Sequence, residues 1–324
     1  MSAFIDQARA RYGVEPICRT LGVSPSAYYQ RATGERSARS VEDERLCARI
    51  REVHSENFEC YGYPRVWHEL RRQGERVGRD RVARLMRQEG IRGAKRRGKP
   101  WRTTIADPQA HKRPDLVQRD FTAQRPDALW VGDLTYLRTW EGRVYFAFLI
   151  DVFSRMIVGW QVATHMRTDL VLDAVRMALG TRQPGADLAL VCHTDQGSQY
   201  TAEDYTQVLD DHRVLASVGS VGDAYDNALA ESFVDSYKTE LIADRVWRTN
   251  AQLELATVTY VGWFNHRRLH SSIGNRPPIE HEHEYRVRVA LGFEPGPAQA
   301  APTVTDLRDV LSLASPLGGL EHSH

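Results

Sequence analysis

The sequence predicts a mixed α/β sheet with flanking helices, preceded by all-α modules of helix-turn-helix type. From residue 126, three strand-like segments follow one another, and helices and strands alternate beyond them. Before residue 100, apolar residues recur instead at helical spacing, in short segments interrupted by glycine and proline. Basic residues are concentrated in the first 120 positions, which sets the helical part apart from the rest.

Residues 1–36 predict three short helices, in FIDQARARYG, VEPICRTLG and SPSAYYQRAT. Gly22 ends the second helix, and Ser24 with Pro25 begins the third, because serine caps helices and proline is tolerated at the first helical position. This is the layout of a helix-turn-helix module, although a plain helical hairpin fits the spacing equally well. We expect Tyr28 and Arg31 of the third helix to contact DNA.

Residues 37–100 predict a second helical DNA-binding module, with helices at 42–55, in RVWHELRRQG after Pro64, and in VGRDRVARLMRQEG. Its apolar residues form the core and leave arginines on the outer faces, suited to phosphate contacts. These are Arg71, Arg72, Arg79, Arg81, Arg84 and Arg87. The basic run GAKRRGKPWRTT leads into a basic linker at 101–124, with Arg96 and Arg97 as expected DNA contacts; a solvated linker without a ligand is the alternative.

Residues 125–290 predict the sheet. ALWVGDLTYLRT alternates as a strand does, VYFAFLIDVF is continuously apolar like a central strand covered on both faces, and RMIVGWQVA is a third strand. TDLVLDAVRMALG and AEDYTQVLDDH are helices that alternate with the strands LALVCHTD and RVLASV. A long helix starts near Asp226, and residues 291–324 are expected to be a flexible tail.

The net charge of +1 hides an uneven distribution along the chain. Residues 1–120 carry 26 Lys and Arg against 16 Asp and Glu, whereas residues 121–324 carry 17 against 26. A basic helical half suits a polyanion such as DNA, although a merely soluble basic surface is the plainer explanation.

Long apolar runs of about 18 residues and a signal-peptide layout are both missing, so an intracellular protein without a membrane partner is expected. Cys18, Cys47, Cys60 and Cys192 are scattered without paired CxxC spacing. Neither a disulfide nor a structural zinc site is therefore expected.

Three carboxylates stand in segments that otherwise look buried or helical: Asp133 in WVGDLTYL, Asp195 in VCHTDQGSQY and Glu231 in DNALAESFVDSYK. An ionised carboxylate away from water must be paired or must bind a cation. Each alone has a plainer explanation, as a satisfied strand acid, a turn residue and a surface helix glutamate. Together they suggest Mg²⁺-assisted phosphoryl transfer, with water or a DNA 3′-hydroxyl as the attacking group.

Lys238 follows Glu231 by seven residues on the same predicted helix. The two side chains then lie about 20° apart around the helix axis, two turns from each other. Because both lie beside the apolar stripe, we expect both to face a bound phosphodiester.

Four further residues attract attention but have plainer explanations than a functional site. Asp151 ends an apolar strand before a Ser-Arg turn, which favours a turn or cap role over a fourth metal ligand. His193 is interpreted as a histidine at the core edge rather than a contact to metal or DNA. His281 and His283 in EHEHEY are interpreted as part of a solvated polar run rather than a metal site.

A basic group lies near the predicted end of a later helix, in NHRRLHSS. Its side chains either cap that helix or bind a phosphate, and we predict phosphate contacts for His266, Arg267 and Arg268.

Four motifs in order resemble the core shared by DDE transposases and retroviral integrases: WVGDLTYL with LIDVFSRMIVGW, HTDQGSQY, DAYDNALAESF with its downstream lysine, and NHRRLHSSIGNRPP. They are more closely similar to the second-reading-frame transposase of the insertion-sequence-three group of bacterial mobile elements. The resemblance covers residues 1–285, including the helical modules.

The resemblance implies a ribonuclease-H-like core in which Asp133, Asp195 and Glu231 are catalytic and bind Mg²⁺, with Mn²⁺ as the expected substitute. It makes Lys238 the basic residue that follows the third acid. It also implies that Gly197, Gln199 and Tyr200 shape the loop after Asp195, and that Asn227 braces Glu231. Gln199, Tyr200 and Asn227 are further expected to contact DNA.

The implied activity is cleavage at DNA 3′ ends followed by strand transfer, through a copied-out circular intermediate. The implied partners are the terminal repeats of the element, target DNA, an upstream-frame protein or a fusion with it, and further copies of the chain on DNA. The implied location is the bacterial cytoplasm, at the nucleoid.

Two other functions are compatible with parts of the pattern. A structure-selective nuclease of the same fold would not need the helical modules and the NHRRLHSS segment. A non-catalytic DNA-binding regulator derived from a transposase would be expected to have lost an acid, and all three acids are present.

Overall fold

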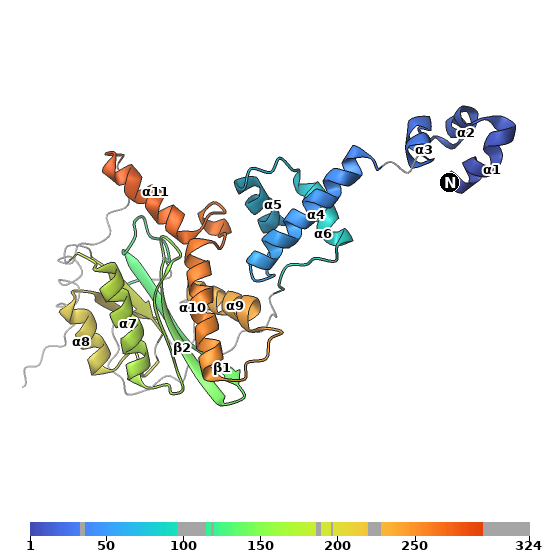
Figure 1. Ribbon diagram of the computed structural model, residues 1–324. Coiled ribbons are helices and arrows are strands. Elements are labelled where there is room, and N and C mark those ends of the chain that lie inside the picture. Colours follow the sequence, from blue (N-terminus) through green and yellow to red (C-terminus); the bar gives the residue numbers. More distant parts are fainter. Residues whose placement is uncertain are drawn as a thin grey trace, which may run out of the picture. The chain divides into compact units, whose positions relative to one another are not determined.

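The computed structural model describes residues 1–32, 36–95, 115–117, 120–185, 189–195, 197–219 and 228–293. The chain divides into two compact units, Met1–Gly93 and Ala94–His324 (Figure 1). In these described ranges, no helix combines the length and apolarity needed to cross a membrane.

The first three helices are those that the sequence predicts: α1 (Ser2–Tyr12), α2 (Val14–Leu21) and α3 (Pro25–Ala32). Gly22 ends α2 in the left-handed conformation, with φ of 65°. Such a φ favours glycine, which has no Cβ. A small core holds them together, formed by Ile5, Ile17, Cys18 and Tyr28.

The next three helices are α4 (Ala38–Glu56), α5 (Tyr63–Arg72) and α6 (Arg79–Gln88). The apolar residues predicted for α6, Val82, Leu85 and Met86, are buried. Two of the arginines predicted on outer faces, Arg81 and Arg84, are partly exposed and are engaged by an acid of α4. Both pair with Asp43 at 2.7 Å.

The second unit is built on a five-stranded sheet in the order β3-β2-β1-β4-β5. Its strands are β1 (Leu129–Thr139), β2 (Gly142–Asp151), β3 (Ile157–Ala163), β4 (Val191–Thr194) and β5 (Leu215–Val218). β1, β2 and β3 pair antiparallel, whereas β4 runs parallel to both β1 and β5. The predicted mixed sheet is confirmed, including the near-complete burial of the continuously apolar β2.

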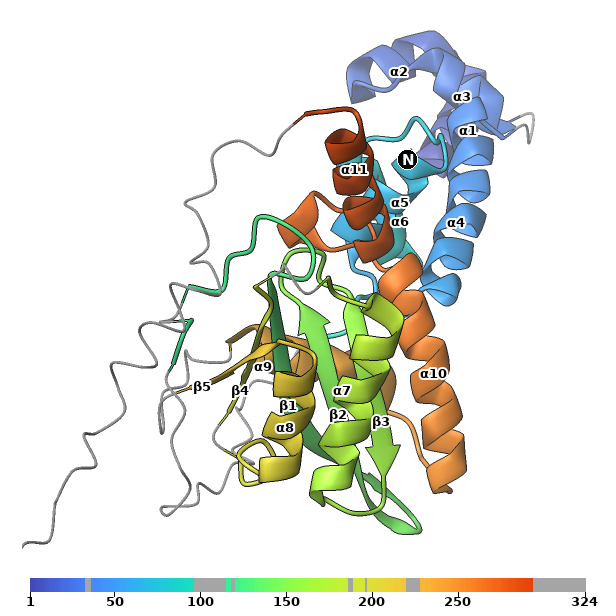
Figure 2. The ribbon, with the colours of Figure 1, turned by 90° about the vertical axis from the view of Figure 1, so that its left-hand side faces the viewer.

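Helices cover both faces of the sheet, with α7 (Thr168–Arg182) and α8 (Glu203–Asp211) on one side and α9 (Ala228–Tyr237) on the other (Figure 2). α7 lies against β3 so closely that a Cβ on Gly159 would come within 2.1 Å of the Ala174 carbonyl oxygen. The core on this face joins Trp130, Ala147 and Leu149 of the sheet to residues 170–179 of α7.

After α9 come a π-helical turn η1 (Lys238–Ile242), α10 (Asn250–His266), a short 3-10 turn η2 (Ser271–Ile273) and α11 (Pro278–Ala290). The run EHEHEY lies within α11, where Glu280, His283 and Glu284 are exposed as expected of a solvated polar run, but Glu282 is not. Glu282 is buried there and pairs with Arg182 at 2.9 Å. His281 stacks on Phe153, with ring centroids 4.8 Å apart.

Asp151 braces the β2–β3 turn, as expected. It is fully buried, and its carboxylate accepts hydrogen bonds from the backbone N–H of Asp127 and from both the N–H and hydroxyl of Ser154. His193 is a buried core histidine, also as expected, with Nδ1 2.9 Å from the Ser217 hydroxyl. The four cysteines are buried free thiols.

Candidate active site

Asp133 and Asp195 come from neighbouring parallel strands. β1 pairs with β4 through Trp130 with Cys192 and Val131 with His193, and each acid lies two residues beyond the last of these pairs. A Cβ on Gly132 would lie 3.2 Å from the Thr194 methyl group, so the two strands are still in contact at this level. The sheet therefore places the two acids side by side.

Glu231 is brought to the same place by the packing of α9 on the sheet. Phe148 is the cross-strand partner of Asp133, and Phe233 packs on it with ring centroids 4.5 Å apart. One turn further along α9, Tyr237 stacks on Phe146 at 4.7 Å. The same contacts bring the part of α9 that carries Glu231 to the face of the sheet that bears Asp133, although the exposed Glu231 side chain leaves the helix about 200° from that of Phe233.

The pKa of Asp133 is affected by the charges of the other two acids and of Lys238. The pKa of Asp133 is raised to about 8, mainly by burial and also by the negative charges of Asp195 and Glu231. The hydrogen bond from the Leu134 N–H and the positive charge of Lys238 act in the opposite direction. The pKa of Glu231 is also raised, by burial and then by Asp235.

Across the described ranges, no three His, Cys, Asp or Glu side chains form a group that could hold a metal ion. Asp133, Asp195 and Glu231 thus interact through their charges without forming a closed ligand set. Glu231 is the exposed member of the three. A rotation of its side chain is the smallest change that would alter its distance to the other two.

Lys238 lies where α9 passes into the π-helical turn. Its Nζ is 5.5 Å from the ring centroid of Tyr136, on the strand that carries Asp133. Burial lowers the pKa of Lys238, while the charge of Asp133 raises it. A pocket of about 420 Å³ opens here between β1 and the π turn, lined by Tyr136, Leu137, Arg138, Asp235, Lys238, Thr239, Ile242 and Ala243.

The loop after Asp195 folds back onto that acid. The Gly197 N–H donates to Asp195 Oδ1 at 3.1 Å, and the Gln199 amide donates to the Met166 carbonyl at 3.2 Å. Tyr200 is only 5% exposed, so the prediction that it contacts DNA is wrong: its ring packs on Tyr205 in the core. Asn227 lies outside the described residues.

The basic group at the end of α10 separates into two kinds of residue. His266 and Arg267 are exposed, as a phosphate contact requires. Arg268 is 4% exposed and binds Glu240 through two hydrogen bonds, so the prediction that it contacts DNA is wrong. Its charge is satisfied inside the protein.

Among the N-terminal candidates, Arg31 is exposed, but Tyr28 is buried and its hydroxyl donates to Asp6 at 2.5 Å. The expected DNA contact through Tyr28 is therefore wrong, because its ring belongs to the small core. Arg96 and Arg97 lie outside the described residues.

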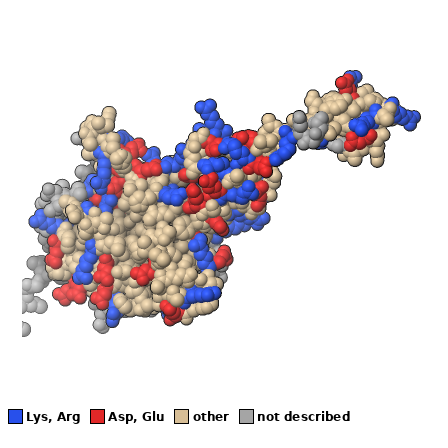
Figure 3. All heavy atoms as spheres, in the orientation of Figure 1, with Lys and Arg blue, Asp and Glu red and all other residues tan. Residues whose placement is uncertain are grey.

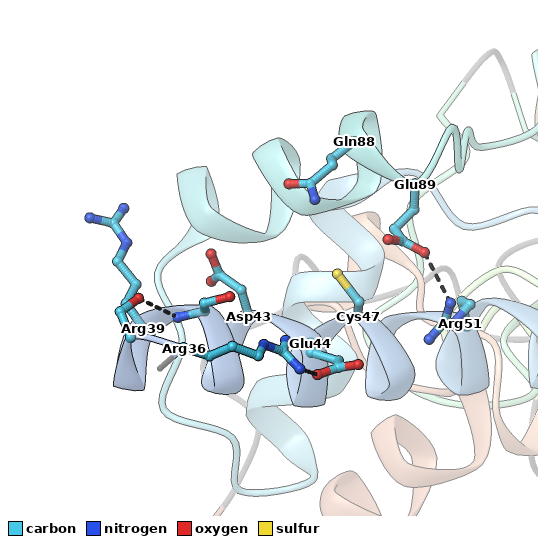
Figure 4. A pocket seen from close by; sticks show the side chains of 10 residues that line it. Arg36, Arg39, Asp43, Glu44, Cys47, Arg51, Gln88 and Glu89 are labelled. Atoms are coloured by element: carbon cyan, nitrogen blue, oxygen red, sulfur yellow. Dashed lines mark hydrogen bonds and ion pairs between the residues drawn. The ribbon is translucent and has the colours of Figure 1, made fainter. Parts of the chain in front are cut away.

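A polar pocket of about 450 Å³ lies beside α4 (Figure 4). Two of its arginines are paired with acids of the same module: Arg36 with Glu44 at 2.6 Å and Arg51 with Glu89 at 3.1 Å. On the visible face, basic and acidic side chains alternate around α4 (Figure 3). The described part of this module is less strongly basic at its surface than the residue count suggests.

Glu240 is a residue of interest that the sequence pattern does not single out, although it lies in the segment that carries Glu231 and Lys238. It is 8% exposed and binds Arg268. The feature of the sequence that could have indicated its burial is its position between Tyr237 and Leu241, two residues of the predicted apolar stripe.

Comparison with known families matches two models described as Integrase core domain, at residues 123–224 and 212–278. A model described as HTH-like domain matches residues 41–99. The transposase for insertion sequence element IS629 of Shigella sonnei is 47% identical over 290 residues, which are 88% of this chain and 96% of that protein. Transposase InsF for insertion sequence IS3A of Escherichia coli (strain K12) is 33% identical over 289 residues, which are 87% of this chain and 98% of that protein.

Among solved structures, the catalytic core domain of BIV integrase is similar to this chain at 20% sequence identity. The matched region is 51% of this chain and 99% of the integrase chain. Its TM-score is 0.37.

Proposed function

Because the chain belongs to the insertion-sequence-three group of transposases, we propose that it cuts DNA at the 3′ ends of an insertion element and joins those ends to target DNA. The observation that carries the proposal is the pairing of β1 with β4, whose last pair, Val131 with His193, lies two residues before Asp133 and Asp195. Acids from two strands and a helix act on one another across the face of an integrase core. Relatives similar over nearly their whole length are transposases, so a nuclease or a regulator is not favoured.

The donor set fits a divalent metal. Carboxylate oxygens are the ligands that Mg²⁺ prefers, and few are needed because the ion keeps several waters. The repulsion that raises the pKa of Asp133 is the kind that a nearby cation would compensate. We therefore propose Asp133, Asp195 and Glu231 as ligands of Mg²⁺, with Mn²⁺ as a substitute; bound divalent ions supply charge stabilisation for the attacking and leaving oxygens.

The chain's own residues have separate tasks in this proposal. Asp133 lies on β1 and Asp195 directly after β4, so the sheet sets the backbone positions of both. Glu231 joins them from α9, whose position depends on the contact between Phe233 and Phe148. The Lys238 ammonium lies over the Tyr136 ring and would bind the DNA phosphate next to the cleaved bond.

Outside the core, we propose that the helical unit binds DNA, through Arg31 and through the module that matches the HTH-like domain. His266 and Arg267 are further candidates for phosphate contacts, since both are exposed. Gln199, which is anchored on Met166, would support the loop beside the DNA. We also propose that several copies of the chain assemble on DNA, and that an upstream-frame protein or a fusion with it takes part.

The test is strand transfer by the purified full chain. DNA fragments that flank the coding region in its source genome, with labelled 3′ ends, are incubated with a supercoiled plasmid and Mg²⁺. The proposal expects labelled joint products with wild-type protein and none with Glu231→Gln. Nicked fragments without joining would indicate a nuclease, and binding without any cleavage would indicate a regulator.

A further inference from the structure

A buried ion pair joins the end of the catalytic helix to the end of α10. The side chains of Glu240 and Arg268 are 6% and 5% exposed. Arg268 Nε donates to Glu240 Oε2 at 2.8 Å and Nη2 donates to Oε1 at 2.6 Å, while the Tyr260 hydroxyl donates to Oε2 at 2.9 Å. Both carboxylate oxygens are thus satisfied, which a buried charge requires.

The guanidinium of Arg268 is also held from its other sides. Its central carbon lies 5.1 Å from the ring centroid of Phe264, and Nη1 lies 3.2 Å from His270 Nδ1. The Phe264 and His270 rings meet edge to face at 4.6 Å. The orientation of Arg268 is therefore determined by α10 and the segment directly after it.

Glu240 lies at the centre of the π-helical turn Lys238–Ile242. The turn is closed by the Ala243 N–H, which donates to the Lys238 carbonyl at 2.7 Å. π-helical turns are rare and are often found at functional sites. Here the Arg268 ion pair supplies a side-chain contact that stabilises the turn from within the core.

Lys238 precedes Glu240 by two residues in the π-helical turn, so the two side chains leave it in roughly opposite directions. Glu240 points to the core, whereas the Lys238 amine lies over the Tyr136 ring and lines the pocket beside β1. Any rotation of the turn that releases Glu240 must also move Lys238.

We propose that Arg268 and Glu240 are positioning residues for the strand-transfer reaction, because their ion pair fixes the π-helical turn that presents Lys238 to the DNA phosphate next to the reacting bond. The inference rests on the proposed function for the identity of this ligand. In this role Arg268 acts from inside the protein, through Glu240, and does not contact DNA itself.

The first test measures the position of Lys238 without any DNA. The chain has four lysines, at 95, 99, 112 and 238, so acetylation of each can be followed by peptide mass spectrometry. In Arg268→Lys the charge remains but the two-point interaction with Glu240 does not, since lysine has no planar fork. We expect Lys238 to be acetylated several-fold faster in this variant, relative to Lys95 in the same molecule.

Arg182→Lys is the matched control. Arg182 is 7% exposed and pairs with Asp127 and Glu282 in the same unit. It should lower stability in the same way without changing the acetylation of Lys238. If Arg268→Lys does not fold, Glu240→Met/Arg268→Met removes the pair without leaving a lone buried charge. Unchanged Lys238 acetylation in a folded variant would overturn the inference.

The second test is a double-mutant cycle on strand transfer. Arg268→Lys should lower kcat/KM by about tenfold to a hundredfold, as expected for small misplacements of a positioned group. In a Lys238→Ala background the same change should have less than about a twofold effect, whereas independent sites would be additive. Additive effects of Arg268→Lys and Lys238→Ala contradict the inference. If wild-type protein joins no DNA, the proposed function fails while the acetylation result still decides the positioning role.

Discussion

Phe233 packs on Phe148, and this contact holds the helix of the third acid against the face of the sheet that bears the first. Phe148 pairs with Asp133 across β1 and β2, and Glu231 lies two residues before Phe233. The acids repel one another, as the pKa of Asp133 shows, so they cannot hold this arrangement themselves. An aromatic contact in the core supplies the order that the carboxylates need.

Removing one acid should abolish strand transfer and leave the fold intact. Asp195→Asn and Glu231→Gln are each expected to lower the rate by more than about a thousandfold, as loss of one member of a catalytic set does. Quantified joint products on gels give the rate, and circular dichroism checks the fold. Glu254→Gln, an exposed acid of α10, is the control and should keep full activity. Equal activity of either acid variant would refute the metal-ligand assignment.

Much of this site can be predicted from local sequence pattern. Strand alternation and helical periodicity depend on neighbouring residues, so the strand of Asp133 and the helix of Glu231 are recognisable in the sequence alone. The grouping of the acids follows from motif order and from the resemblance that these motifs carry.

The partners of charged residues cannot be predicted in the same way. Arg267 and Arg268 are adjacent and look alike in sequence, yet one is exposed and the other is buried against Glu240, 28 residues earlier. Arg182 and Glu282 are 100 residues apart. Such pairs depend on tertiary packing, which leaves no local periodicity. For the same reason α11 is not recognisable in the sequence, since its buried acid looks like part of a polar loop.

Removing the helical unit, Met1–Gly93, should weaken DNA binding and reduce its dependence on salt. Every phosphate that the truncated chain no longer contacts should lower the slope of log affinity against log salt by about 0.9. Fluorescence anisotropy with a labelled duplex across a salt series measures this slope. Arg31→Gln in the full chain should change this slope by the amount expected for one phosphate contact, because Arg31 is exposed and is a candidate for such a contact. An unchanged slope after removal of the whole unit would place DNA recognition in the core.

Because of Asp151, the free energy of unfolding of the core should fall as pH rises from about 4 to neutral. Burial raises its pKa from 3.8 to about 6, so between these values the folded chain binds the proton that the unfolded chain has lost. The stability contribution of this group is therefore full below pH 4 and falls by about 3 kcal/mol up to neutral pH.

Urea unfolding from pH 4 to pH 7 tests this. In Asp151→Asn the group no longer titrates, although the N–H of Asp127 loses its acceptor. The variant's deficit relative to wild type should thus shrink as pH rises. Asp173→Asn, an exposed acid of α7, should show a constant difference. Parallel curves for Asp151→Asn and wild type would show that Asp151 keeps an ordinary pKa.

Two glycines should respond in opposite directions to alanine. At Gly159 a Cβ would lie 2.1 Å from the Ala174 carbonyl oxygen and 2.8 Å from the Ala178 Cβ, so α7 must move away from β3. Gly180, on α7 itself, has no atom within 4 Å of the added Cβ. Gly159→Ala is expected to destabilise the core by about 3 kcal/mol or more through overpacking. Gly180→Ala is expected to stabilise it by about 0.5 to 1 kcal/mol, because glycine is unfavourable inside a helix.

Denaturant midpoints of the two variants and wild type measure both effects with the same assay. Because α7 covers the face of the sheet opposite α9, a folded Gly159→Ala protein should lose stability and keep the contact between Phe233 and Phe148. Its strand-transfer rate at a temperature well below the transition should therefore stay near that of wild type. A midpoint equal to that of wild type would mean that α7 and β3 are less closely packed than the contact at Gly159 indicates.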